Sequence, residues 1–496
     1  MNTTYGVVAV TLVAVATLVI GAFGLRMSRT TSDFYVASRS VSPVLNSSAI
    51  GGEYLSAASF LGVAGLVLTY GADMLWYPIG WTTGYLLLLV FVAAPLRRSG
   101  AYTIPDFAQV RLQSLAVRRV ASVLVVAVGW LYLMPQFQGA GLTLRTVTGA
   151  PTWVGTVVVA AVVVVNVVSG GMRSITFVQA FQYWLKLTAL LVPLFFLVHA
   201  WTADDRPSPV APSAWFQPFS HADGPGLYLT YSVMIATFLG TMGLPHVVVR
   251  FYTNPDGHAA RRTTLFVLAL LGVFYLLPTV YGVLGRIYAR DLLSTGRADT
   301  VVLELPSRML GGATGELLAA LLTAGAFAAF LSTSSGLTMS VAGVVGQGLA
   351  RGRLSTVTAL RLSAVGCVLV PLVLALSAER ISVANSVTFA FALAASTFCP
   401  LLVLGIWWRG LTAPGAIAGL VGGGVCASIP PVVTIVAAPA GWLGVLMSQP
   451  AAWTVPIGFA LMIGVSLATR QRVPANVSRT MVRLHTPERL EVDRRY

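Results

Sequence analysis

Apolar runs long enough to cross a bilayer recur along the whole chain. We count thirteen of them, and a helical span needs about 20 apolar residues. Only 9% of the 496 residues are charged, against about a quarter in a typical soluble protein. Inside hydrocarbon every backbone polar group must be bonded within the protein, which leaves helices and closed barrels as spanning structures. The length of the runs therefore predicts an all-α polytopic membrane protein.

The loops between the runs support this count. The runs lie at about 5–24, 44–70, 74–95, 118–147, 153–169, 176–200, 227–249, 264–288, 315–349, 356–377, 384–407, 412–436 and 452–469. Every second loop carries arginine: Arg26, Arg29 and Arg39; Arg97, Arg98 and Arg111; Arg173; Arg250, Arg261 and Arg262; Arg351 and Arg353; Arg409; and seven arginines from Arg470 to Arg495. Cytoplasmic loops carry the excess of positive residues. Thirteen spans with an outer N-terminus would place these loops and the C-terminus on the cytoplasmic side of the cell inner (plasma) membrane.

Charge and cysteine content exclude several kinds of protein. The formal net charge is +15, from 31 Lys+Arg against 16 Asp+Glu. In a soluble protein this excess would suggest nucleic acid. Here the arginines follow the loop alternation, so the expected partner is the lipid bilayer and not nucleic acid. The three cysteines lie in apolar runs without metal-binding spacing, which predicts neither disulfides nor a metal site, and we expect no organic cofactor.

The chain divides into a single transmembrane domain over residues 1–469 and a basic cytoplasmic tail over 470–496. The tail is polar and rich in arginine, which is typical of a segment that is disordered or lies on lipid headgroups. Binding of a partner at this tail remains open.

One expected span contains polar residues that lipid does not tolerate. The stretch Ser48–Gly62 carries Glu53, Tyr54 and several serines beside the pair Gly51 and Gly52. Unmet polar groups in hydrocarbon cost several kcal/mol, and an ionisable residue within a span is a candidate functional residue. We expect a helix broken near the glycine pair that faces protein or a wet cavity. The alternative is a structural glutamate bonded to a backbone amide.

A second broken helix is expected in the seventh span. Gly240, Gly243 and Pro245 fall within six residues, which interrupts regular backbone bonding. The two broken spans are five helices apart. Broken helices at corresponding positions of two halves indicate an inverted-repeat transporter with a midplane site, here with repeats at about 44–200 and 227–407. Close helix packing is the alternative explanation of these glycines.

The ninth span is unusually rich in hydroxyl groups. Five serines and threonines fall between Ser332 and Thr338. Hydroxyl and carbonyl oxygens are the ligands of hard cations, and the Ala329 carbonyl lies one turn before Thr333. With carbonyls freed at the first break, these oxygens predict a sodium site. The alternative is that each hydroxyl bonds back to its own helix.

Several motifs resemble those of the sodium/solute symporter family, and within it the cation/acetate, or short monocarboxylate, branch. They are Ser32–Ala37 (SDFYVA), Tyr54–Gly62 (YLSAASFLG), Tyr102–Phe107 (YTIPDF) with Arg111, Ser169–Met172 (SGGM), Gly243–Tyr252 (GLPHVVVRFY), and Trp407–Arg409 (WWR) ahead of Gly415. They run in order over most of the chain. The resemblance implies a leucine-transporter-like core, in which one helix precedes two inverted five-helix repeats and two helices follow.

The resemblance also implies an ion site. Carried over position by position, its sodium ligands are the carbonyls of Gly52, Leu55 and Ala329 and the hydroxyls of Ser332 and Thr333. Acetate-type members often lack this hydroxyl pair, so the chain departs from them towards sodium binding.

Four residues near these ligands are candidates for ion coupling: Glu53, Tyr54, Gln179 and Lys186. Gln179 stands where the family commonly has aspartate, and Lys186 follows two turns later. An ammonium can occupy a cation site, so a proton-coupled or ion-independent mechanism through Lys186 is an alternative, as is a proton carried by Glu53. A lysine that reaches to the membrane interface is the structural explanation of Lys186.

The substrate candidates implied by the resemblance come from four spans. They are Ser59 and Phe60 past the first break, Trp76, Gln136 and Gln138, and Thr237 and Gly240 at the second break. Amides, hydroxyls and helix N-termini can bind a carboxylate without a full positive charge. Packing is the alternative role of either glutamine alone. We expect His246 and Arg250 to anchor the cytoplasmic face instead.

These features predict a secondary-active symporter that couples inward sodium movement to uptake of a small organic anion by alternating access. The expected solute is a short-chain monocarboxylate such as acetate, propionate or pyruvate. The alternatives are proton-coupled uptake and a sensor that keeps the transporter fold. Because no nucleophile–base set, carboxylate pair or histidine cluster lies near a membrane face, we expect no enzyme activity and no catalytic residues.

Overall fold

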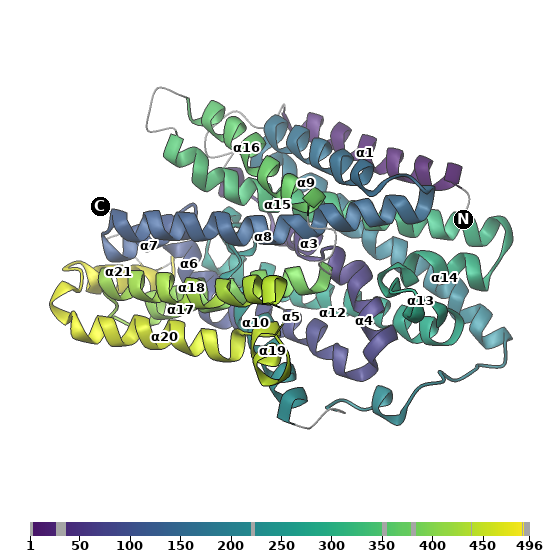
Figure 1. The fold of residues 1–496 in the computed structure, drawn as a ribbon. Helices are drawn as coiled ribbons and strands as arrows, with labels where there is room; N and C mark the ends of the chain where they lie inside the picture. The colour runs from purple at the N-terminus through teal and green to yellow at the C-terminus, as the bar shows by residue number, and fades with distance from the viewer. Residues whose placement is uncertain are drawn as a thin grey trace.

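Long helices that run along one common axis build the protein, as the computed structural model shows (Figure 1). The structure describes residues 3–25, 36–219, 224–349, 355–377, 383–437, 439–488 and 490. Within these ranges every regular element is helical. The two ends of the chain lie at opposite ends of the bundle (Figure 1), as an odd number of crossings requires.

The helices fall into two groups either side of a long connection after residue 203. The first group is α1 (Thr3–Leu25), α3 (Pro43–Tyr54), α4 (Val63–Tyr70), α5 (Trp76–Leu87), α6 (Ala93–Arg98), α7 (Ile104–Leu112), α8 (Leu115–Thr148) and α9 (Thr152–Ala203). The second is α10 (Gly224–Gly243), α11 (Pro245–Val249), α12 (Gly257–Tyr288), α13 (Asp291–Ser294), α14 (Val301–Met309), α15 (Gly312–Leu349), α16 (Thr356–Ser377), α17 (Val383–Trp407), α18 (Ala413–Ala437), α19 (Gly441–Ser448), α20 (Ala451–Ala468) and α21 (Val477–His485).

Eleven helices in the described ranges are long and apolar enough to cross a membrane, against thirteen expected. The difference arises because two pairs of runs are joined. The runs at 153–169 and 176–200 together carry the label α9, but they are two helices that meet at Gly171, where φ is 60° and ψ is −167°. The run at 74–95 continues without a long loop from the part of 44–70 that follows the first break. The expected runs are helical, and the lower count comes from two joins, at Gly171 and at Gly71, that each contain a non-helical glycine.

The surface of the bundle is apolar and its interior is polar in places, the reverse of a soluble protein. Phe195 and Leu276 are 73% and 67% exposed, whereas Glu53, Lys186 and Arg250 are almost fully buried. Contiguous exposed apolar surface of this kind is suited to contact with lipid. The bundle interior is therefore where a polar function is expected.

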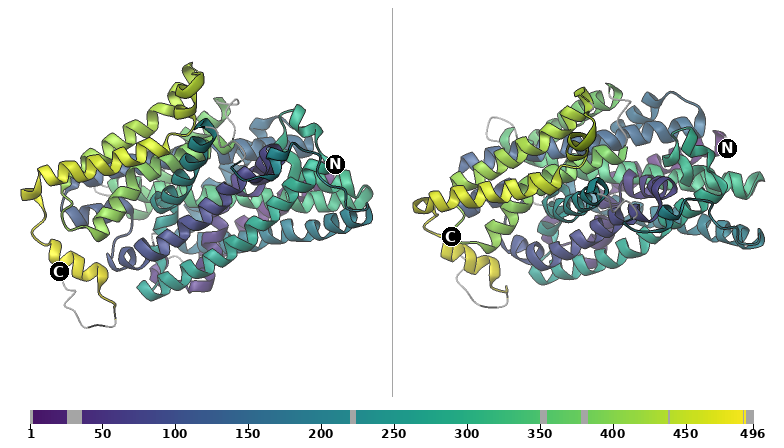
Figure 2. Two further views of the ribbon diagram at one scale, coloured as in Figure 1. Left: turned by 90° about the horizontal axis from the view of Figure 1, so that it is seen from below. Right: turned by 60° about the horizontal axis from the view of Figure 1, so that its bottom comes forward.

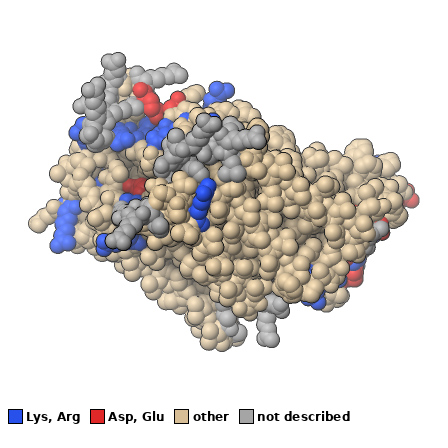
Figure 3. All heavy atoms as spheres, turned by 90° about the horizontal axis from the view of Figure 1, so that it is seen from above, with Lys and Arg blue, Asp and Glu red and all other residues tan. Residues whose placement is uncertain are grey.

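Arginines gather at one end of the bundle, here called the arginine-rich end, where α6, α7 and α21 lie (Figure 3). Among the expected cytoplasmic arginines, seven lie outside the described residues: Arg26, Arg29, Arg351, Arg353, Arg489, Arg494 and Arg495. Arg111 is buried and donates to the carbonyls of Gly405 and Trp408 at 2.8 and 2.9 Å. It thereby ties α7 to the end of α17.

Part of the basic tail is helical, so the expectation of disorder is wrong for residues 477–485, while contact of the tail with lipid headgroups stays a prediction. Helix α21 buries Met481 and Leu484, which lie on one face of the helix. Glu488 then forms an ion pair with Arg98 at 3.2 Å and accepts from the Gly257 amide at 2.8 Å. Figure 2 shows this yellow segment at the arginine-rich end.

Candidate functional site

The first expected break is confirmed between α3 and α4. Helix α3 ends at Tyr54, and Leu55 has φ −73° and ψ 86°, outside the helical region. Winding resumes through a wide π-helical turn at Ala58–Gly62. A regular helix bonds each carbonyl to the amide four residues later. The break therefore leaves carbonyl oxygens of the last α3 turn available to side chains.

Glycine at position 52 allows this broken end to approach α9 closely. A Cβ on Gly52 would overlap the Gln179 carbonyl, so any side chain there would push α3 away from α9. The glycine pair thus has a packing role as well as the expected effect on helix winding.

All five predicted sodium ligands lie together beside the break. The Thr333 hydroxyl donates to the Glu53 carbonyl at 2.6 Å, which ties α15 to α3. The Ser332 hydroxyl donates to the Ala329 carbonyl at 3.1 Å, within its own helix. Ser332 therefore bonds back to its helix, as the alternative expected, while Thr333 reaches across to the break.

Lys186 lies at the centre of this ligand group. Its Nζ donates to the carbonyls of Gly52 and Leu55 at 2.5 and 2.8 Å and to the Ser332 hydroxyl at 3.0 Å. An ammonium has three N–H donors, and all three are used. The side chain is completely buried, so the explanation that Lys186 reaches to an interface is wrong.

Glu53 is bonded to Arg250 and not to a backbone amide. The Arg250 Nε lies 2.5 Å from Glu53 Oε2. Arg250 also donates to the Thr176 hydroxyl at 2.9 Å and to the Gln179 side-chain oxygen. Removing either charge of a buried pair leaves the other uncompensated. Gln179 extends this network to α15, because its amide donates to the Ser332 carbonyl at 2.8 Å.

The expectation that His246 and Arg250 anchor the cytoplasmic face is wrong. Both are completely buried, because α11 and the turn after it run beneath the first break. Asn46 of α3 donates to the Arg250 carbonyl at 3.3 Å. The His246 ring packs edge-on against Tyr132 with centroids 5.3 Å apart.

The second expected break is confirmed between α10 and α11. Leu244 is extended, with φ −69° and ψ 118°, and Pro245 starts the short helix α11. Gly240 and Gly243 lie directly against the carbonyls of Phe391 and Ala394 on α17. Close backbone packing, the alternative given for these glycines, therefore exists together with the break.

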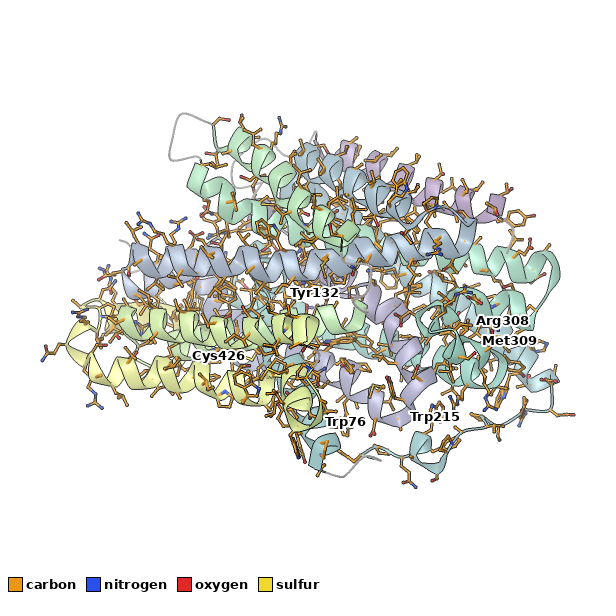
Figure 4. The ribbon with its side chains drawn as sticks, in the orientation of Figure 1. Trp76, Tyr132, Trp215, Arg308, Met309 and Cys426 are labelled. Atoms are coloured by element: carbon orange, nitrogen blue, oxygen red, sulfur yellow. The ribbon has the colours of Figure 1, made fainter. Side chains whose placement is uncertain are left out.

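A cluster of aromatic side chains lies between the two breaks and is here called the aromatic box. Its members are Tyr54, Trp81, Tyr85, Tyr132, Tyr275 and Phe391, with neighbouring ring centroids 4.8 to 6.1 Å apart. The Tyr54 hydroxyl lies 2.7 Å from Thr241 Oγ1, which joins the first broken helix to the second. Figure 4 labels Tyr132 on α8 in the middle of the bundle.

Three buried donors at this box have no hydrogen-bond partner among the described residues. They are Trp81 Nε1, the Tyr85 hydroxyl and Gln136 Nε2. Gln136 lies one turn after Tyr132 on α8, and its side-chain oxygen accepts from the Ala57 amide at 3.1 Å just past the first break. A buried donor without an acceptor costs about 1–3 kcal/mol, so these groups point to a polar ligand that would accept from them.

Of the other predicted substrate residues, Ser59 lies at the edge of the box, and Phe60 and Trp76 pack against other rings. Ser59 Oγ is 3.0 Å from the Tyr275 hydroxyl at its edge, and Gln138 is half-buried two residues beyond Gln136. Phe60 packs against Phe274. Trp76 packs against Phe219 at a centroid distance of 4.7 Å, and in Figure 4 it lies well away from Tyr132.

The two predicted substrate residues of α10 make contacts within the bundle. The Thr237 hydroxyl donates back to the Val233 carbonyl at 2.8 Å. Gly240 touches α17, as described above. The structure thus brings Ser59 and Gln136 to the aromatic box and gives the α10 residues packing contacts.

An open cavity of about 770 Å³, not foreseen from the sequence, lies at the end opposite the arginine-rich end. It is lined by Trp76 and by the carboxylates Asp73 and Asp299. Burial raises the pKa of the Asp299 carboxyl to about 6. Tyr77 also lines the cavity and packs against Trp81 of the aromatic box, with ring centroids 5.7 Å apart, so the cavity adjoins the box.

The chain is similar in sequence to known symporters over most of its length. The pattern of the sodium:solute symporter family matches residues 34–423. The uncharacterized symporter YwcA of Bacillus subtilis strain 168 is 30% identical over 501 residues, which cover 96% of this chain and 97% of that protein. The monocarboxylic acid transporter of Corynebacterium glutamicum is 32% identical over 433 residues, which cover 80% and 78%.

Similarity to solved structures confirms a leucine-transporter-like fold. A Na+-coupled sialic acid symporter in a substrate-bound outward-open state has a TM-score of 0.71 at 15% identity, covering 94% of this chain and 97% of its own. Mhp1, a nucleobase-cation-symport-1 family transporter in a closed conformation, has a TM-score of 0.57 at 12% identity, covering 92% and 99%.

Proposed function

Because the chain belongs to the sodium:solute symporter family, we propose that it carries a short-chain monocarboxylate inward together with sodium by alternating access. The family is one of transporters, and the chain is not an enzyme. We assign α1 as the helix before the core, 44–200 and 227–407 as the two inverted repeats, and α18 and α20 as the helices that follow.

One observation carries this proposal. The two broken helices meet through the contact of Tyr54 with Thr241, with the predicted ion ligands and the aromatic box both beside this junction. Broken helices at a midplane site are typical of transporters in which one repeat moves against the other. Binding of the cation and binding of the solute can therefore both change the contact between the two broken helices.

The transport cycle follows from this arrangement. A cation bound at Gly52, Ser332 and Thr333 would hold the broken end of α3 against α15 and prepare the box for solute. Solute in the box would draw α10 and α5 together, and loss of the cation on the low-sodium side would release both. If sodium raises the affinity for solute by some factor, solute must raise the affinity for sodium by the same factor. We propose that the arginine-rich end is cytoplasmic.

A monocarboxylate suits the groups that line the box. Trp81, Tyr85 and Gln136 offer neutral donors for a carboxylate, while the surrounding rings would pack against a short alkyl or keto chain. The name of the 32% identical relative, a monocarboxylic acid transporter, supports the same solute class. Acetate, propionate and pyruvate are the solutes we propose to test first.

Counterflow in proteoliposomes tests this function. Vesicles loaded with an unlabelled monocarboxylate should accumulate the labelled form transiently when sodium is present, and vesicles without protein should not. Absence of exchange across monocarboxylates, amino acids and sugars would defeat the transport proposal and favour a sensor. Replacing the sodium gradient with a pH gradient separates sodium symport from the alternative of proton-coupled uptake through Glu53 or Lys186.

A further inference from the structure

Lys186 is the only lysine of the chain; the other 30 basic side chains counted with it are arginines. This lysine lies in the membrane-spanning helix α9 and is completely buried. Arginine presents a planar fork of donors, whereas the lysine ammonium is a compact point charge. The position therefore holds the side chain that most resembles a monovalent metal cation.

The acceptors of Lys186 are atoms assigned above to sodium. The carbonyls of Gly52 and Leu55 and the Ser332 hydroxyl are three of the five predicted ligands, and Nζ contacts them at 2.5, 2.8 and 3.0 Å. A cation that binds the same three oxygens would overlap the ammonium. Sodium and Lys186 Nζ therefore exclude each other by size.

The charges around the site lead to the same exclusion. Glu53 is already paired with Arg250, and Gln179, which bridges Arg250 and the Ser332 carbonyl, is neutral. Lys186 is the second positive charge in this buried group. Sodium added beside it would be a third positive charge against one carboxylate, and buried like charges repel strongly at low dielectric constant.

We infer that the ammonium of Lys186 and a sodium ion are alternative occupants of one site, so that sodium binds only after Lys186 has left it. This inference rests on the proposed sodium symport. It adds that a side chain of the protein, Lys186, competes with sodium for the site. In the absence of sodium, Lys186 ties the broken end of α3 to α15. Removing the ammonium should therefore raise sodium affinity while it loosens the sodium-free protein.

Binding of ²²Na⁺ to the purified protein tests the inference without any transport step. Lys186→Met keeps an unbranched apolar side chain and removes the charge. We expect its sodium dissociation constant to be at least tenfold lower than that of the wild type. Arg308→Gln, which removes a charge at an exposed position of α14, is the control and should leave sodium binding unchanged. Equal sodium affinities in Lys186→Met and the wild type would overturn the inference.

A second measurement uses the wild type and covers the case in which Lys186→Met does not fold. The labelling of Lys186 by a small amine-reactive reagent is followed by mass spectrometry of its peptide, in sodium chloride and in N-methylglucamine chloride. Sodium should increase labelling severalfold, because it displaces the amine from its three acceptors. Labelling that saturating sodium leaves unchanged would overturn the inference. If Lys186→Met binds sodium more tightly as expected but the wild type shows no counterflow, the proposed transport function is wrong and the inference about Lys186 stands.

Discussion

The two broken helices differ in what fills the gap that each break creates. At the first break, between α3 and α4, the freed carbonyls accept from Lys186 and Thr333. At the second break, between α10 and α11, the glycines lie against the backbone of α17. Similar sequence signals thus produce a break that polar side chains fill in one case and a close-packed joint in the other.

The difference teaches that a break alone does not define a binding site. What distinguishes the first break is its surroundings, because α9 brings a lysine, α15 brings hydroxyl groups, and Arg250 in the turn after α11 pairs with Glu53. The second break faces α17, whose nearest groups are main-chain carbonyls. Function at a broken helix therefore depends on the helices that pack against it.

The largest expected effect compares one glycine from each break. Gly52→Val should abolish uptake and also sodium binding, by roughly fiftyfold or more, because its Cβ would collide with the Gln179 carbonyl. Gly240→Val should abolish uptake but keep ²²Na⁺ binding within about twofold, because it disturbs the joint with α17 only. Loss of sodium binding in both variants would show that the two breaks are not separable in this way.

The buried ion pair provides the next largest effect. Glu53→Gln leaves Arg250 buried without a counter-charge, which costs about 3–5 kcal/mol. A large fall in the thermal unfolding temperature, measured in detergent, is the expected result. Arg308→Gln on the protein surface is the control, since exposed ion pairs contribute little. Similar shifts for both variants would mean that charge compensation at the first break is unimportant.

The hydroxyl pair of α15 should have an intermediate effect. Ser332→Ala combined with Thr333→Ala should raise the sodium concentration for half-maximal uptake more than tenfold, because two predicted ligands are lost. The neighbouring double variant Ser334→Ala with Ser335→Ala is the control, and it should change that concentration little. Unchanged sodium dependence in the Ser332 and Thr333 variant would argue for proton coupling.

The smallest expected effect concerns the aromatic box. Gln136→Leu should raise the KM for solute three- to tenfold, the loss expected for about one hydrogen bond, and should leave the sodium dependence almost unchanged. Initial uptake rates over a range of solute concentrations measure this directly. Thr237→Val is the control, because its hydroxyl bonds within α10. An equal effect of both changes would remove Gln136 from the solute site.

The sequence predicted the breaks and the ion cluster because both depend on local signals. A glycine pair beside an acid marked the first break, two glycines with a proline marked the second, and Ser332 and Thr333 are neighbours in the sequence. Lys186 follows Gln179 by two helical turns in the sequence. This spacing was enough to predict, as an alternative, that the Lys186 ammonium occupies the cation site.

What could not be predicted depends on packing between distant segments. The partner of Glu53 is Arg250, nearly two hundred residues away, and only the turn of α11 beneath the first break brings it there. The aromatic box likewise draws Trp81, Tyr132 and Phe391 from three helices. The only sequence signal for this ion pair was that Glu53, an acid within a span, needs a partner. Arg250, which follows the second broken helix, could have been proposed as that partner.

The ordered tail has a consequence for how movement could be observed. Glu488, just after α21, holds Arg98 at the end of α6 and the Gly257 amide at the start of α12, and these two helices belong to the two different repeats that we propose. A movement that separates α6 from α12 must break one of these two contacts of Glu488. A fluorophore attached beside Glu488 should therefore report such a movement from outside the bundle.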